Sequence, residues 1–144
     1  MIFISTGYAS KQYPEKTIAD LIDNGYEHIE LSSGKFSKNL KKKLDNFKNK
    51  VNLQFHNYFP PPQKNFVLNL ASLDEYISRR TISHFYKAID WSSSIGSKYY
   101  SLHAGFRVDI KTNEIGKIIK KKKLQNYEES VDIFIKRLNL ISKY

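Results

Sequence analysis

The chain has 144 residues, enough for one domain with a buried core, and no stretch is apolar enough to cross a membrane. It contains no cysteine, which excludes disulfides and thiolate metal ligands and leaves His, Asp and Glu as candidate ligands. The formal net charge is +10, but nearly all of it comes from lysine, so we do not expect nucleic acid as a partner. The first residues, Met1–Ile4, lack the features of a signal peptide, so we expect a cytoplasmic protein.

Strand patterns and helix patterns alternate along the chain. The period-two alternation of apolar residues predicts strands over Ile2–Thr6, His28–Leu31, Val51–His56 and Tyr99–Ala104. Apolar residues at helical spacing predict helices over residues 14–25, over residues 36–47, from Ser72 to near Gly96, and from Asn126 onward. This order predicts an α/β fold in which four parallel strands lie in sequential order with helices outside.

Capping residues predict where two of the helices begin. Ser72 has a glutamate three residues on, so we expect its hydroxyl to accept the N–H of that residue. Asn126 is expected to cap the last helix. The buried stripe of that helix is expected to be Val131, Ile135 and Leu138. A long polar loop, Phe106–Gln125, precedes it and contains the run Lys120–Lys123, which we expect to be a solvated surface.

The third predicted strand ends in a polar residue at a place where parallel sheets bind ligands. Its apolar residues fall on one face, and His56 falls on the other. Three prolines follow shortly after and forbid further pairing, so His56 stands at the carboxyl end of the strand. Glu30 and His103 occupy similar places on the second and fourth strands. We therefore expect these three side chains to converge on one concave surface.

The segments F-H-N-Y-F-P-P-P, F-V-L-N-L-A-S and G-S-K-Y-Y-S-L-H-A-G-F resemble the amino-terminal half of the xylose-isomerase-like TIM barrels. That superfamily includes sugar-phosphate isomerases and epimerases and the endonuclease IV type of apurinic-site nucleases. The resemblance spans the chain and implies a single domain over residues 1–144, a (β/α)4 half of a (β/α)8 barrel. Because a complete barrel needs about 250 residues, we expect a truncated or split product, or a half that a partner completes.

The resemblance implies a metal-dependent sugar site. Histidines at the ends of the third and fourth strands bind zinc in the endonuclease IV relatives, so His56 and His103 would ligate a divalent metal, zinc or manganese. From its place on the second strand, Glu30 is predicted to bind substrate or act as the catalytic base. The predicted substrate-binding residues are Asn57, Tyr58 and Asn69. The carboxylates that the family draws from its later strands have no counterpart in this chain.

Three functions are open on the sequence. The preferred one is a sugar or sugar-phosphate isomerase or epimerase, inactive as this fragment alone, because Tyr58, Phe59 and the prolines resemble the walls of a small-molecule pocket. The alternatives are an endonuclease IV-like zinc phosphodiesterase on abasic DNA and a non-catalytic half-barrel binding module. An isolated half would expose two strand edges and an apolar inner face, so we expect self-association or pairing with a second half-barrel chain.

Overall fold

The computed structural model describes residues 1–119 and 122–144 of the chain. These residues divide into two compact units, each of which is described by itself. Unit 1 comprises Met1–Gln63 and Lys87–Leu102, and unit 2 comprises Lys64–Tyr86 and His103–Tyr144. The expectation of a single domain over residues 1–144 stays a prediction.

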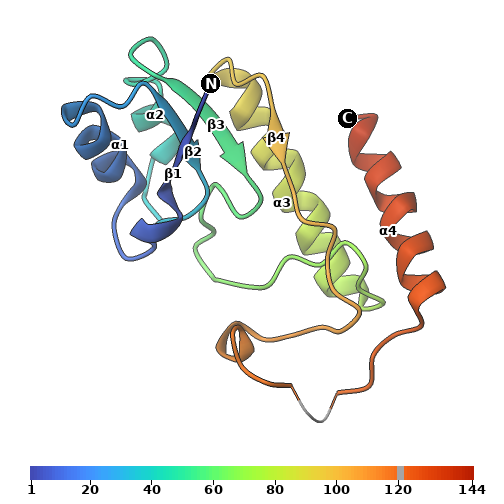
Figure 1. Cartoon of the computed structure of the whole chain (residues 1–144). Helices are drawn as coiled ribbons and strands as arrows, with labels where there is room; N and C mark the ends of the chain where they lie inside the picture. The colour runs from blue at the N-terminus through green and yellow to red at the C-terminus, as the bar shows by residue number, and fades with distance from the viewer. Residues whose placement is uncertain (120–121) are drawn as a thin grey trace. The chain divides into compact units, whose positions relative to one another are not determined.

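Unit 1 contains a four-stranded sheet in which all strands are parallel and lie in the order β1-β2-β3-β4 (Figure 1). The strands are β1 (Ile4–Ser5), β2 (His28–Leu31), β3 (Asn52–His56) and β4 (Tyr100–Ser101). The predicted α/β class, the parallel pairing and the sequential strand order are therefore confirmed.

The two outer strands are shorter than predicted. The first ends at Ser5 rather than Thr6, because Thr6 begins a turn and its hydroxyl accepts the N–H of Ser32 instead. The fourth ends at Ser101 rather than Ala104. Its neighbour β3 ends directly opposite, at His56, so the residues after Ser101 have no strand beside them to pair with.

The helical segments are η1 (Thr6–Ala9), α1 (Pro14–Asp23), α2 (Leu40–Leu44), α3 (Glu75–Ser94), η2 (Thr112–Glu114) and α4 (Tyr127–Ser142). α1 and α2 belong to unit 1, η2 and α4 belong to unit 2, and the chain passes from unit 2 to unit 1 within α3. α2 is shorter than predicted because Asn39 has a φ of 59°, a left-handed conformation through which a helix cannot run back to Phe36. None of the helices in the described parts of the chain is long and apolar enough to span a membrane.

The core of unit 1 lies between one face of the sheet and its helices. In β2 and β3 the buried residues alternate with half-buried or exposed polar ones, as the sequence pattern predicts. The buried cluster is Ile18, Leu21, Ile29, Leu31, Leu40, Leu44, Val51, Leu53, Phe55, Phe59 and Ile95. The other face carries polar side chains, among them Glu30, Gln54 and His56. The prediction of an apolar inner face is therefore wrong for β2 and β3, because the residues that alternate with their buried ones are polar.

The amino terminus of α3 is capped by a different residue from the one predicted. Asp74 Oδ1 accepts the N–H groups of Tyr76 and Ile77, at 2.8 and 3.0 Å. Ser72 Oγ instead accepts the N–H of Asp74 at 3.0 Å, and its hydroxyl donates to Asp109 Oδ2 at 2.8 Å. The predicted Ser72 cap is wrong because Asp74 stands immediately before the first turn and supplies the oxygen itself.

α4 begins as predicted, and its predicted stripe is confirmed only in part. Asn126 Oδ1 accepts the N–H of Glu129 at 3.0 Å, which confirms the predicted cap. Val131 and Leu138 are half-buried, whereas Ile135 is 48% exposed, so Ile135 was wrongly placed on the stripe. The buried residues of the helix are Ser130 and Ile141. Arg137, on the buried side, donates to the carbonyl oxygens of Leu70 and Ser72 at 2.7 and 2.6 Å, which fixes this orientation.

The predicted lysine run is only partly described. Lys120 and Lys121 lie outside the described residues. Lys123 is exposed, as expected of a solvated surface, but Lys122 is not. Its Nζ donates to Glu114 Oε2 at 2.6 Å and to the Asp109 carbonyl oxygen at 2.8 Å, so this lysine closes the loop around η2.

Replacing Asp74 with Ala should lower the free energy of unfolding by about 1 kcal/mol, because two N–H groups of α3 lose their shared acceptor. Asp74→Asn keeps an oxygen in the same place and should cost much less. Urea unfolding followed by circular dichroism measures both changes. An equal loss in the two variants would show that the charge of Asp74, and not its capping geometry, is what stabilises the helix.

Candidate functional site

The carboxyl ends of β2 and β3 bring Glu30 and His56 together. Glu30 Oε2 lies 3.5 Å from His56 Nδ1, and the two side chains are 25% and 27% exposed. Strand alternation places both on the face opposite the core, where a small molecule can reach them. Two of the three residues that the sequence predicted to converge are therefore in contact within unit 1.

Ser101 is a further member of this site. Its Oγ lies 3.1 Å from His56 Nδ1, and the two residues are opposite one another in the register of β3 and β4. Nδ1 thus lies beside both the carboxylate of Glu30 and the hydroxyl of Ser101, and these two contacts orient the imidazole ring. The sequence pattern placed Ser101 on the polar parity of the fourth strand, but only the register reveals that it meets His56.

The turn after β3 is held by the main chain of Asn57. Its N–H donates to the Ser101 carbonyl oxygen at 2.6 Å, and its own carbonyl oxygen accepts the Tyr100 hydroxyl at 2.7 Å. Asn57 has a φ of 39°, which asparagine tolerates better than most residues. Burial raises the pKa of the Tyr100 hydroxyl above its ordinary value, so this group stays a donor. The substrate contacts predicted for Asn57 and Tyr58 stay predictions, and both residues are half-buried beside His56.

Glu30, His56 and Ser101 form a row of polar side chains across the sheet, which we call the polar row. Hydroxyl groups at the ends of β1 and β2 continue it. The Oγ atoms of Ser5 and Ser32 lie 2.9 Å apart, and Ser5 is opposite Glu30 in the register. Thr6 is buried, and its hydroxyl ties the end of β1 to Ser32. Sequence reasoning did not select these residues. The signal that identifies them is their position at the carboxyl ends of β1 and β2, where Ser5 closes one strand and Thr6 and Ser32 follow directly.

His103, the third residue predicted to converge, belongs to a different unit from Glu30 and His56. It lies beyond β4, is exposed, and belongs to unit 2, whereas His56 and Glu30 belong to unit 1. Its predicted convergence with His56 therefore stays a prediction.

The described residues do not make a complete metal site. A carboxylate and an imidazole are both ligands that zinc and manganese accept, and Glu30 and His56 supply one of each. Protein zinc sites use three or four protein ligands, and among residues 1–119 and 122–144 no group of three or more His, Asp or Glu side chains gathers.

Asn69, predicted to bind substrate, is the centre of a buried network in unit 2. It is 2% exposed, and its Oδ1 accepts the N–H groups of Ala71 and Phe106 at 3.1 and 2.9 Å. Its Nδ2 donates to the Phe106 carbonyl oxygen at 3.0 Å and to Asp109 Oδ1 at 2.8 Å. All four hydrogen-bonding positions of the amide are therefore occupied by protein groups. This geometry gives Asn69 a structural role, and its predicted substrate contact stays a prediction.

A glycine sits against this network. A Cβ atom at Gly105 would lie 2.5 Å from Asn69 Oδ1 and 3.1 Å from the main-chain nitrogen of Ala71, and Gly105 has a φ of 123°. No other residue fits such an approach in that conformation. The segment H-A-G-F therefore contains a glycine because the chain after β4 passes close to the buried amide.

Comparison with protein-family models, with curated proteins and with solved structures finds no match to this chain.

Asn69→Ala should lower the free energy of unfolding by about 3 kcal/mol, because it leaves buried main-chain groups of Ala71 and Phe106 without partners. Asn139→Ala, at an exposed position of α4, is the matched control and should change stability by less than about 0.5 kcal/mol. Urea unfolding of both variants gives the comparison. If both variants were as stable as the parent chain, the network would not be what holds this part of unit 2.

Proposed function

We propose that the chain forms the amino-terminal (β/α)4 half of a xylose-isomerase-like barrel, and that the complete barrel is a sugar or sugar-phosphate isomerase or epimerase. The observation that carries the proposal is the contact between Glu30 and His56 at the carboxyl ends of adjacent parallel strands, the end at which such barrels hold their active sites. The sequential parallel sheet with helices packed on one face supports it, since half a barrel requires that arrangement.

The proposed chemistry is a proton transfer between neighbouring carbons of a hydroxy-carbonyl sugar. Glu30 would take the proton from the carbon beside the carbonyl and return it to the adjacent carbon or to the opposite face. His56 would orient the carboxylate and exchange a proton with the carbonyl oxygen, and Ser101 would hold the imidazole in place. The low exposure of both side chains favours proton transfer to a bound molecule over transfer to bulk water.

The metal that the resemblance implies is also a proposal. By the resemblance, His56 would be a ligand of zinc or manganese, and further ligands would come from the second half of the barrel. When bound, the ion would polarise the carbonyl and hydroxyl oxygens of the sugar.

A non-catalytic binding role is the second candidate. The observation that favours it is that the polar row at the strand ends is largely satisfied internally, by the contacts Ser5–Ser32, Ser101–His56 and Glu30–His56. A site of this kind can bind a hydroxylated ligand without turning it over.

In a barrel completed by self-association or by a second half-barrel chain, Glu30→Gln should abolish the exchange of sugar protons with solvent while leaving the fold unchanged, because the amide cannot act as a base. The measurement is deuterium incorporation next to the carbonyl of pentose and hexose phosphates in heavy water, followed by NMR. A loss of about 100-fold or more is expected. Arg79→Gln, on an exposed surface, is the control. Exchange that survives in Glu30→Gln would remove the proposed base, and cleavage of abasic DNA by the parent chain would support a nuclease instead.

Self-association is expected because β1 and β4 are the two edge strands of the sheet in unit 1, and an edge strand can pair with a strand of another chain. Light scattering should give at least twice the mass of one chain. Tyr99→Lys adds a charge next to the β4 edge and should favour the monomer, whereas Tyr8→Lys, at an equally exposed tyrosine (69% in both cases), should not. A stable monomer that isomerises sugars would contradict the proposal that a second half is needed.

A further inference from the structure

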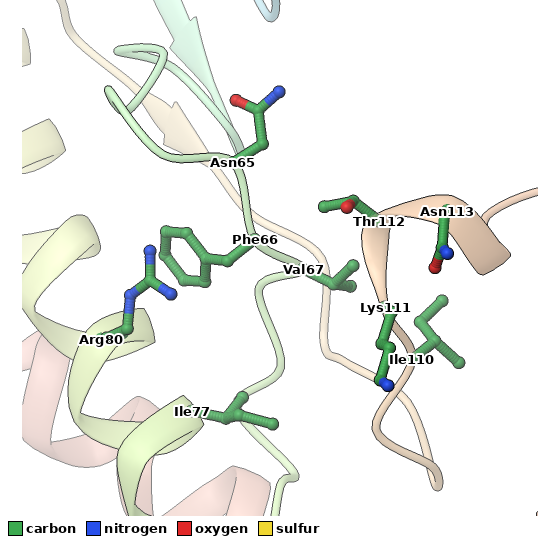
Figure 2. Close-up of a pocket in the computed structure, with 9 residues that line it drawn as sticks. All are labelled: Asn65, Phe66, Val67, Ile77, Arg80, Ile110, Lys111, Thr112 and Asn113. Carbon is green, nitrogen blue, oxygen red and sulfur yellow. The ribbon is translucent and has the colours of Figure 1, made fainter.

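Unit 2 contains a hollow that the proposed chemistry does not use. Its cavity volume is about 500 Å³, within the range of small-molecule sites. It lies between the segment that follows β3 in the chain, the first turns of α3, and the loop that carries η2 (Figure 2). Apolar side chains form much of its wall. They are Phe66, Val67, Ile77 and Ile110.

Arg80 is held in place on this wall. Figure 2 shows its guanidinium reaching from α3 to the ring of Phe66, and Cζ lies 3.9 Å from the ring centroid. Nη2 donates to the Lys64 carbonyl oxygen at 3.2 Å, and Nη1 lies 3.5 Å from the Tyr76 hydroxyl. These contacts use only part of the five N–H groups of an arginine. The guanidinium is therefore ordered before a ligand arrives, which lowers the entropic cost of binding.

The charge of the pocket is positive and is not neutralised by its own lining. Lys111 comes from the facing loop, and the lining residues include no Asp or Glu. Two acids of that loop are already engaged. Glu114 accepts hydrogen bonds from Lys122 Nζ and from the Lys111 N–H, both at 2.6 Å, and the Asp109 carboxylate accepts from Asn69 and Ser72. The Lys122 contact, followed by the Lys111 one, holds the pKa of Glu114 below its usual range, so Glu114 stays paired and ionised.

The remaining polar groups of the lining are neutral. Thr112 offers a hydroxyl, and Asn113 and Asn65 offer amides. Two cations with several neutral donors suit a group that carries nearly two negative charges and three acceptor oxygens, which is a phosphate monoester. The apolar wall beside them suits a planar, weakly polar body better than a polyhydroxylated one.

We propose that this pocket binds a phosphate monoester with a planar apolar body, such as a nucleoside monophosphate. Arg80, ordered against Phe66, holds the phosphate, Lys111 adds positive charge from the facing loop, and Val67, Ile77 and Ile110 hold the planar body. The proposal uses residues of unit 2 alone and does not depend on the sugar chemistry proposed for Glu30 and His56.

The test is calorimetric titration of the whole chain at about 0.15 M salt with four probes: adenosine monophosphate, adenosine, ribose 5-phosphate and inorganic phosphate. Adenosine monophosphate should bind most tightly. Adenosine lacks the phosphate, and the other two lack the planar body, so each should bind about tenfold more weakly or worse. Equal affinity for adenosine and its monophosphate would overturn the assignment of the phosphate. Equal affinity for ribose 5-phosphate and adenosine monophosphate would overturn that of the planar body.

Variants distinguish binding of the phosphate in this pocket from general attraction of an anion to a basic protein. Arg80→Gln and Lys111→Gln should each weaken binding of adenosine monophosphate about tenfold or more. The matched controls are Arg79→Gln, whose guanidinium is 77% exposed and paired with Glu75, and Lys117→Gln, at an exposed position of the same loop. Equal losses in all four variants, or in none, would overturn the proposal.

Loss of folding in one variant does not obscure the result. If Arg80→Gln lowers the unfolding midpoint, Lys111→Gln decides, because the contacts that Lys111 makes to Glu114 come from its main-chain N–H and carbonyl groups and survive the substitution.

Discussion

The parallel pairing of β2 with β3 is the interaction on which the rest of unit 1 depends. It places Ile29 beside Leu53 and Leu31 beside Phe55, so the apolar residues of both strands face the same helices. The same register places the residues between them, and with them Glu30 and His56, on the opposite face. A slip of one residue in either strand would exchange the two faces and destroy the core and the contact between Glu30 and His56 together. The core and this contact are therefore set by one register.

Unit 2 depends on buried polar contacts more than on a sheet. The amide of Asn69 fixes Phe106 and Asp109, and Asp109 in turn accepts the hydroxyl of Ser72. Arg137 extends this network from α4 to the carbonyl oxygens of Leu70 and Ser72. A loop held through its main chain keeps its remaining side chains in place, which is what a preorganised binding pocket requires. The pocket lined by Arg80 and Lys111 lies on segments that this network supports.

The lysines of this chain have different roles, which depend on the groups around each of them. In unit 1, Lys43 and Ser37 both donate to Glu15. Burial raises the pKa of Glu15, but these hydrogen bonds outweigh it, so the net pKa is lowered and the carboxylate stays ionised. In unit 2, Lys122 closes the η2 loop through Glu114, whereas Lys111 faces the pocket. The number of lysines in a sequence does not tell which of them are structural and which could bind a ligand. The groups that each lysine contacts in the folded chain make that distinction.

The sequence by itself determined the class of fold, the parallel order of the strands, the polar parity that carries Glu30 and His56, and the Asn126 cap. The fold class and the strand order follow from the alternation of strand and helix patterns along the chain. The polar parity and the cap follow from residues two to four positions apart, whose relation is fixed by strand or helix geometry alone. Only the tertiary structure decided that Ser101 meets His56, that Asp74 caps α3 in place of Ser72, that Asn69 is enclosed, and that Arg80 and Lys111 line one pocket. Most of these contacts join residues tens of positions apart, and the strand register and the course of the loops, which no local pattern encodes, bring them together.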